Sequence, residues 1–200
     1  MAKLMWTQQI EQRGEEIFKG FRITDDVEST YHTLSKYFRN MDGALDLNKG
    51  VMIIGGIGTG KTIAMQVFGR LKGFQVVSTR HIVRDFARDG MSALDRYGRE
   101  SFRQDINQRP KKSEPITVCF DDLGLEDTNS QLYGNKANVM AEVIIDRYEH
   151  WRFHSMITHA TSNLTLDEVA QVYGDRVMDR INEMMNVVVM AGKSKRTNQK

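Results

Sequence analysis

The sequence predicts an α/β sandwich with a mostly parallel sheet. Short apolar runs recur along the chain, segments with helical periodicity separate them, and the first clear run leads directly into a glycine-rich turn. Alternating strands and helices are typical of a parallel sheet covered by helices on both faces. Ligands of such sheets bind at the carboxyl ends of the strands, so the chemistry is expected immediately after them.

Five apolar runs are the expected strands. The first is continuously apolar, as in a parallel strand buried on both faces. The fourth has the weakest pattern. The runs cover 51–54, 74–78, 116–120, 155–161 and 187–190.

Helices are expected before and between these strands. Asp25 and Asp26 supply capping groups for a helix to about Asn40, in which apolar residues recur at helical spacing. Residues 1–20 are polar and expected to be helical without an obvious core face. The other expected helical segments are 61–72, pieces within 82–106, 135–150, 166–172 and 175–182, and 107–115, which holds both prolines, is expected to be a loop.

Composition bounds the class of protein. The 200 residues fit one domain of ordinary size, with 40% hydrophobic and 27% charged residues. No apolar run approaches the roughly 18 residues that span a bilayer, and no signal peptide is evident. The single cysteine, Cys119, lies in an apolar run and is expected to be a buried small hydrophobe. These features predict a cytoplasmic protein with no membrane partner.

Charge is distributed unevenly, although the formal net charge is only +2. Residues 80–112 carry nine Lys or Arg against five Asp or Glu, and 193–200 carry four Lys or Arg and no acid. Either stretch could contact nucleic acid. A solvated surface and a frayed tail are the alternatives.

A complete phosphate-binding motif follows the first strand. Residues 55–62 match G-x-x-x-x-G-K-[ST] and open the next helix. The glycines let backbone N–H groups surround phosphate oxygens, Lys61 can reach the β- and γ-phosphates, and the Thr62 hydroxyl can bind Mg²⁺. ATP and Mg²⁺ are therefore the expected ligands. The expected cofactor-binding residues are Gly55, Gly56, Ile57, Gly58, Thr59, Gly60, Lys61, Thr62 and Ile63.

The third strand ends in two aspartates. Asp121 is expected to hold Mg²⁺ with Thr62, usually through water. Asp122 is placed to polarise the attacking water, a task for which related architectures often use the longer glutamate, so positioning could also fall to Glu126. The alternative is a strand-end turn formed with Gly124.

Polar residues near the carboxyl end of the chain complete the candidate site. Asn163 follows the fourth strand and can contact the attacking water or the γ-phosphate, or simply cap a helix. Arg176 and Arg180 lie four residues apart on one helix face, from which one of them could reach a neighbouring subunit's γ-phosphate. Arg180 is the first choice, and Arg147 is a weaker candidate. An exposed helix with Asp-Arg pairs is the alternative.

Together these motifs resemble the DnaC/IstB-like branch of AAA+ ATPases over about residues 21–196. The resemblance rests on residues 55–62, 120–124, 147–149, 161–164 and 173–180. It implies a P-loop NTPase three-layer sandwich, with strand order 5-1-4-3-2 and no full helical lid. The expected organisation is an N-terminal helical extension at 1–20, an AAA+ ATPase domain at 21–192 and a basic tail at 193–200.

The resemblance also implies roles and partners. Asp121 and Asp122 would form the Walker B end, Asn163 would be sensor 1 and Arg180 the arginine finger, while Lys195 or Arg196 falls near a sensor 2 position. Such proteins self-associate and act on DNA, here expected to be single-stranded, with a replicative helicase or a transposase. The expected DNA contacts are Arg84, Arg88, Arg96, Arg99 and Arg103.

Three functions from different classes remain open at this stage. The first is an ATPase of the helicase-loader type or, alternatively, of the transposition-helper type. The second is a non-hydrolysing switch that displays a surface only with ATP bound, which the short Asp122 favours. The third is a small-molecule P-loop kinase, although a kinase does not need the Asp122 and Asn163 pair directed at water.

Overall fold

The computed structural model describes residues 2–105, 112–126, 130–132 and 135–195 of the chain. A five-stranded sheet forms its centre, and all four neighbouring strand pairs are parallel. The strands lie in the order β2 (Gln75–Ser78), β5 (Val118–Asp121), β8 (Thr158–Ser162), β1 (Gly50–Ile54) and β9 (Met185–Val189). Counted along the chain among these five strands alone, the order from β9 reads 5-1-4-3-2.

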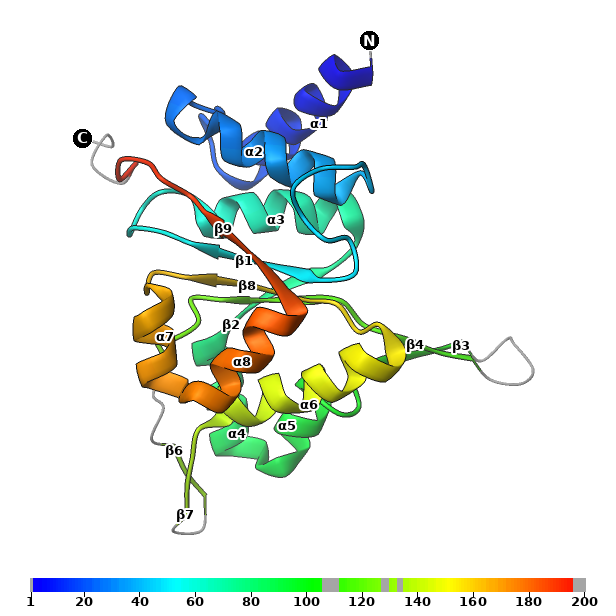
Figure 1. Cartoon of the computed structure of the whole chain (residues 1–200), viewed down its shortest axis with the longest axis vertical. Helices are drawn as coiled ribbons and strands as arrows, with labels where there is room; N and C mark the ends of the chain where they lie inside the picture. The colour runs from blue at the N-terminus through cyan, green and yellow to red at the C-terminus, as the bar shows by residue number, and fades with distance from the viewer. Residues whose placement is uncertain (1, 106–111, 127–129, 133–134, 196–200) are drawn as a thin grey trace.

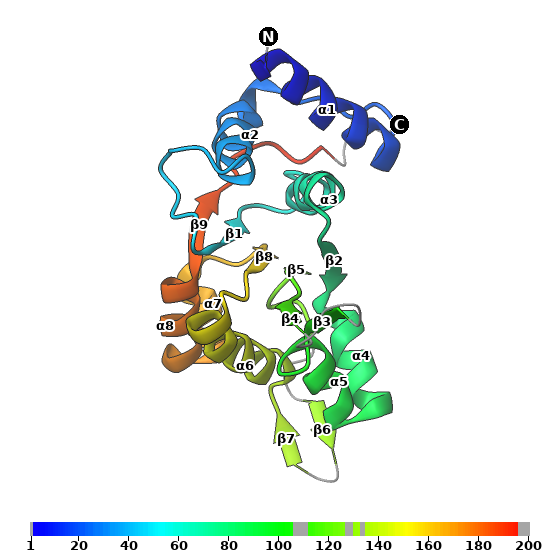
Figure 2. The same ribbon diagram turned by 90° about the vertical axis from the view of Figure 1, so that its right-hand side faces the viewer.

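Helices cover both faces of this sheet (Figures 1 and 2). On one face lie α2 (Asp25–Phe38) and α3 (Lys61–Lys72), with α1 (Ala2–Ile17) against α3. On the other lie α4 (Thr79–Asp89), α5 (Met91–Tyr97), α6 (Val139–His154), α7 (Leu166–Tyr173) and α8 (Asp175–Met184). The predicted three-layer α/β sandwich is confirmed.

The strands supply both halves of the hydrophobic core. Val51 and Ile53 pack with α1, α2 and α3, whereas Met52 packs with the helices of the opposite face. Likewise, Cys119 faces α3 and Phe120 faces the other side. This alternation follows from the two-residue period of a strand, and it explains why the runs are continuously apolar. Cys119 is buried as predicted.

The first helix has a core face that the sequence did not reveal. Ile10 is 1% exposed and belongs to the same cluster as Phe21, which follows the helix, and Phe68 of α3. Trp6 and Ile17 are partly buried against the same cluster, and the few apolar residues of this helix are too widely spaced to show a clear periodicity.

Two hairpins replace segments predicted to be helix or loop. The expected helical stretch 82–106 ends at Tyr97, and β3 (Phe102–Asp105) pairs with β4 (Lys112–Pro115) of the expected loop. In the same way, β6 (Ser130–Leu132) pairs with β7 (Asn135–Ala137) where the helix 135–150 was expected to begin. These strands have only three or four residues, which is too short for a periodic apolar pattern to appear in the sequence.

That later helix, α6, instead begins at Val139 and continues to His154. The Asn138 side chain accepts a hydrogen bond from the Ala141 N–H and so caps its first turn. In the described residues after β9, 190–195, the chain forms no helix. No helix in the described ranges combines the length and the hydropathy needed to cross a membrane.

Candidate active site

The phosphate loop joins β1 directly to α3, as the motif predicts. Gly58 and Gly60 have φ values of 83° and 100°, a left-handed backbone that a residue with a Cβ adopts only with strain. Gly58 has a second constraint, because a Cβ there would lie 2.3 Å from Oγ of Ser194. Thr59 is buried and donates to the Gly56 carbonyl at 3.1 Å, which holds the turn closed. The loop leads into the amino end of α3, where backbone N–H groups can bind an anion.

Lys61, the first residue of α3, is folded inward and only 4% exposed. Its ammonium group donates to the carbonyls of Gly55 and Gly56 at 2.7 and 2.8 Å and to Oδ1 of Asn163 at 2.7 Å. Two predicted catalytic residues, Lys61 and Asn163, are thus in direct contact although 102 positions separate them. In a nucleotide complex, phosphate oxygens would replace the Gly55 and Gly56 carbonyls as acceptors of the Lys61 ammonium group.

Thr62 and Asp121 form the predicted metal-binding pair. The Thr62 hydroxyl donates to Oδ1 of Asp121 at 2.9 Å, and the Thr161 hydroxyl donates to the same oxygen at 2.6 Å. Burial raises the pKa of Asp121, while the hydrogen bonds from Thr161 and Thr62 act in the opposite direction. A hydroxyl and a carboxylate in contact beside a phosphate loop are hard oxygen ligands of the kind that Mg²⁺ takes. The residues present therefore fit this cation.

Asp122 sits in a left-handed conformation, with φ of 60°. Such backbones cost free energy in residues with a side chain and tend to occur at functional sites. The Asp122 N–H donates to Oγ1 of Thr161 at 3.0 Å, and its carboxylate accepts from Nδ2 of Asn163 at 3.2 Å. Asn163 therefore connects Lys61 to Asp122 through the two ends of one amide.

Two threonines of this site were not predicted. Thr161 bridges Asp121 and Asp122 from β8, and Thr79, fully buried at the start of α4, donates to the Asp122 carbonyl at 3.1 Å. Thr79 directly follows β2 and Thr161 is the next-to-last residue of β8, and both strands are adjacent to β5. The rule that function collects at the carboxyl ends of strands could have found Thr79, had it been applied to β2 as well.

Glu126, the suggested substitute for Asp122, is buried and has both carboxylate oxygens engaged. Oε2 accepts from the Gly124 N–H at 2.9 Å, and Oε1 accepts from the Tyr173 hydroxyl. Burial and the neighbouring Glu126 carboxylate raise the pKa of Tyr173. This geometry links the loop after β5 to the end of α7.

Arg147 is not available to another subunit, contrary to its suggested role. It is fully buried, and its guanidinium donates to Thr158 Oγ1, Ser101 Oγ and three backbone carbonyls at 2.6 to 3.1 Å. The carbonyls belong to Tyr97, Ile116 and Ile157. Burial lowers the pKa of Arg147 to about 9. The residue joins α5, β8 and the segments that flank the β3–β4 hairpin.

The two candidate finger arginines lie on α8 in different environments. Arg176 is exposed in the first turn. Arg180 pairs with Asp179 at 2.8 Å, and its guanidinium carbon lies 4.9 Å from the centre of the Tyr148 ring. Lys195, near the suggested sensor 2 position, directs its ammonium group to Thr24 and Asp26 instead, while its N–H donates to the Gly58 carbonyl. Arg196 lies outside the described residues.

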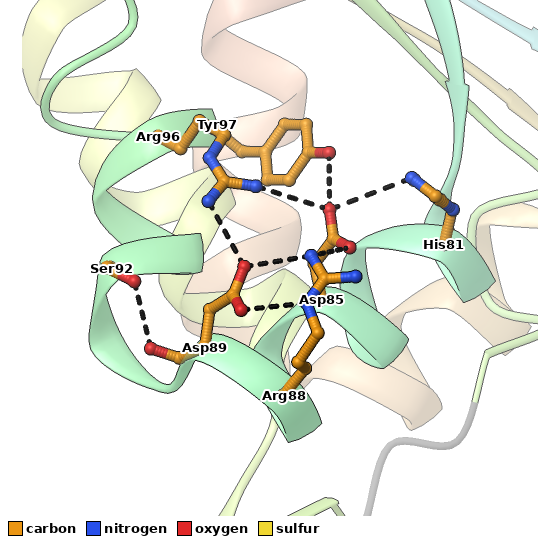
Figure 3. A network of polar contacts seen from close by, with 7 residues as sticks. All are labelled: His81, Asp85, Arg88, Asp89, Ser92, Arg96 and Tyr97. Atoms are coloured by element: carbon orange, nitrogen blue, oxygen red, sulfur yellow. Dashed lines mark hydrogen bonds and ion pairs between the residues drawn. The ribbon is translucent and has the colours of Figure 1, made fainter.

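The five predicted DNA contacts are all exposed but differ in their partners. Arg88 and Arg96 belong to an ionic network with Asp85 and Asp89, in which Tyr97 also donates to Asp85 (Figure 3). Hydrogen bonding from Arg88 lowers the pKa of Asp89 to about 2. Two of the five positive charges are therefore largely neutralised within α4 and α5. Arg84, Arg99 and Arg103 lie outside this network.

The fold and the phosphate loop define a P-loop ATP-binding protein of the AAA+ class. The sequence profile of the IstB-like ATP binding proteins matches residues 38–200. The chain therefore belongs to this family. Comparison with curated proteins found no significant match.

Solved structures with the same fold include DnaI, with 19% identity over 91% of this chain and 93% of DnaI and a TM-score of 0.58. The DnaC helicase loader shows 18% identity over 86% and 94%, with a TM-score of 0.54. The replication initiator DnaA, bound to AMPPCP and single-stranded DNA, shows 14% identity over 86% of this chain and 48% of DnaA, with a TM-score of 0.57. At these identities the similarity shows the shared fold.

Proposed function

We propose that the protein binds ATP with Mg²⁺ and hydrolyses it, and that it acts on DNA with a protein partner in the manner of a DnaC-type helicase loader. Membership of the family of IstB-like ATP binding proteins supports ATP as the ligand. The observation that carries hydrolysis is the contact of Asn163 with both Lys61 and Asp122. A lysine placed to bind phosphates and a carboxylate placed to polarise a water thus contact the same amide.

The reaction assigns one task to each residue. Lys61 and the loop N–H groups bind the β- and γ-phosphates, and Thr62 and Asp121 would hold Mg²⁺, which when bound neutralises charge that develops on the phosphates. Asp122 orients a water and accepts its proton as the oxygen attacks the γ-phosphorus. The bond to the ADP oxygen breaks, and Asn163 keeps Asp122 and the water aligned.

Calorimetry with ATP and Mg²⁺ tests the binding step. Lys61→Ala should weaken binding by about 100-fold, because it removes hydrogen bonds from a charged donor. Lys72→Ala, at the exposed end of the same helix, should bind as the wild type does. Unchanged binding in Lys61→Ala would overturn the proposal. Asp122→Asn should keep the affinity for ATP and lose phosphate release.

Self-association and DNA binding belong to the same proposal. Arg180, or Arg176, would enter the ATP site of a neighbouring subunit. Arg84, Arg99 and Arg103 would supply most of the contacts to DNA phosphates, expected to be single-stranded, since Arg88 and Arg96 are already paired. The affinity for DNA should fall steeply with salt, and a flat salt response would exclude this surface. We place this activity in the cytoplasm.

A transposition-helper role is the second candidate, and the family match favours it. The ATP-locked Asp122→Asn form should retain its partner, so recovery from the host of a replicative helicase or of a transposase separates the two roles. A non-hydrolysing switch is the third candidate, supported by the short side chain of Asp122. Tight ATP binding without turnover, even with DNA and the partner present, would select it.

A further inference from the structure

A buried polar bridge connects the loop after β5 to the junction between α7 and α8. Glu126 and Tyr173 are 7% and 8% exposed, and the Tyr173 hydroxyl donates to the Glu126 carboxylate. The other carboxylate oxygen holds the Gly124 N–H at 2.9 Å. Burying a carboxylate is costly unless it is well bonded, so an apolar pair would be a simpler way to pack these elements.

One end of the bridge lies in the loop that carries Asp122. Asp122 and Gly124 both have left-handed backbones, with φ of 60° and 93°. Leu123 between them is held to β8 by its N–H, which donates to the Thr161 carbonyl at 2.8 Å, and by its carbonyl, which accepts from Ser162 Oγ at 2.6 Å. Because these bonds, together with the one from the Asp122 N–H to Thr161, tie the loop to the end of β8, a shift of this unit toward a bound γ-phosphate would carry Gly124 and Glu126 with it.

The other end lies at a turn. Tyr173 is the last residue of α7, and Gly174, with φ of 83°, separates it from α8. Arg176 and Arg180 are on α8, so the direction in which they project depends on this junction. The Val172 carbonyl also accepts a hydrogen bond from Asn138, which caps α6. The junction is thus tied to the start of α6 by this hydrogen bond and to the acidic loop by the carboxylate bridge.

We infer that Glu126 and Tyr173 are positioning residues that couple the state of the Asp122 loop to the orientation of α8. The inference rests on the proposed function, because it requires a nucleotide to occupy the site beside Asp122. With ATP bound, the bridge would hold α8 so that its arginines face a neighbouring subunit. With the bridge cut, nucleotide would still bind, but α8 would no longer respond.

Hydrogen–deuterium exchange of residues 166–184, with and without AMPPNP and Mg²⁺, tests the coupling without requiring hydrolysis. In the wild type, nucleotide should slow exchange in this segment. Tyr173→Phe should bind nucleotide with wild-type affinity, lose at least half of this protection, and lower stimulated hydrolysis about tenfold, as expected for one hydrogen bond to a charged acceptor. Tyr97→Phe, which removes a Tyr–carboxylate hydrogen bond to Asp85 elsewhere in the fold, should keep the protection.

Glu126→Gln separates positioning from catalysis. Its amide oxygen can accept from the Gly124 N–H while its NH₂ group donates to the Tyr173 oxygen, so both contacts survive without the charge. Wild-type protection and turnover in this variant would support positioning. If Glu126→Gln keeps the protection but loses hydrolysis, Glu126 acts on the water itself and the inference is wrong.

Two other results would also overturn the inference. One is nucleotide binding to the wild type without any change in exchange over 166–184, which leaves the proposed ATPase intact. The other is full protection and turnover in Tyr173→Phe. Failure of the wild type to bind nucleotide in calorimetry would remove the proposed function and the inference together.

Discussion

Asn163 shows how much a single side chain determines in this site. Its oxygen accepts from Lys61 and its nitrogen donates to Asp122, so the orientation of the amide is fixed by partners of opposite charge. A carboxylate at this position would retain the first contact and oppose Asp122 in the second, while an alanine would lose both. An amide is the side chain that satisfies both neighbours, which gives the residue a chemical reason beyond its place after a strand.

At the same scale, Arg147 represents the opposite case, a charged residue with a structural role. Its guanidinium satisfies five neutral acceptors and faces no carboxylate among the described residues. We predict that Arg147→Lys lowers the free energy of unfolding by about 3 kcal/mol, because an ammonium cannot reach all five acceptors and leaves buried oxygens unpaired. Urea unfolding measures this loss.

The same variant has an internal control in nucleotide binding. At a temperature where Arg147→Lys remains folded, its affinity for ATP should equal that of the wild type, since its contacts lie away from the phosphate loop. A variant that unfolds at the wild-type urea concentration would contradict the assigned role. So would one that keeps its stability and loses hydrolysis.

Elements differ in how far the sequence predicts them. The five strands of the sheet and α3 are recognisable because their apolar patterns and the glycine motif are local. The hairpins β3–β4 and β6–β7 are not, because their strands have three or four residues and pair across intervening segments. The start of α6 was misplaced by four residues for the same reason, as β7 occupies the positions before Asn138.

The residues of the candidate site likewise differ in how far the sequence predicts them. Lys61, Thr62, Asp121, Asp122 and Asn163 follow from a motif or from strand ends, and the structure brings them together. Thr161 and the Glu126–Tyr173 bridge depend on which strands and helices are neighbours in space, whereas Thr79 directly follows a strand end and could be found from the sequence. Sequence spacing carries no direct information on these neighbours. For the same reason, the sequence did not show that Arg147, a weaker candidate for the arginine finger, is buried.

The sheet contains a buried histidine, His159, from which we predict how the stability of the fold depends on pH. His159 of β8 accepts a hydrogen bond from the Val51 N–H of β1 through Nδ1 at 3.0 Å, among the rings of Phe38 and Phe74. Burial lowers its pKa from 6.5 to about 3. Below about pH 6.5, His159 binds a proton in the unfolded chain but remains neutral in the folded chain. The free energy of unfolding should therefore decrease as the pH is lowered from 6.5 to 3, by up to about 1.4 kcal/mol per pH unit.

His159→Asn isolates this contribution. The Asn oxygen can accept from the Val51 N–H but does not titrate, so the variant should lose stability less steeply as the pH falls. Asp89 and Asp121 titrate in both proteins, and the difference between the two curves removes their effect. Parallel curves from urea unfolding between pH 7 and 4 would contradict the assignment.

At the scale of the whole molecule, the arginines of α8 are placed where one subunit could complete the site of another. Lys61, Thr62, Asp121, Asp122 and Asn163 converge within one chain, but α8 presents Arg176 and Arg180 from a separate element. Arg180 is restrained by Asp179 and the Tyr148 ring, whereas Arg176 is exposed. A positive charge supplied in trans accelerates phosphoryl transfer by orders of magnitude, so these residues should matter only in an assembly.

Mixing two inactive variants tests this directly. Lys61→Ala binds nucleotide weakly but keeps both arginines, and Arg180→Ala keeps the site and lacks the finger. Each alone should show almost no stimulated phosphate release, whereas an equimolar mixture should recover a fraction of the wild-type rate, because an Arg180→Ala site can then meet an intact arginine. The same mixture with Arg176→Ala in place of Arg180→Ala identifies which arginine acts. If the chains associate with ATP but no mixture recovers activity, neither arginine acts between subunits, and α8 must serve its own site or only its own fold.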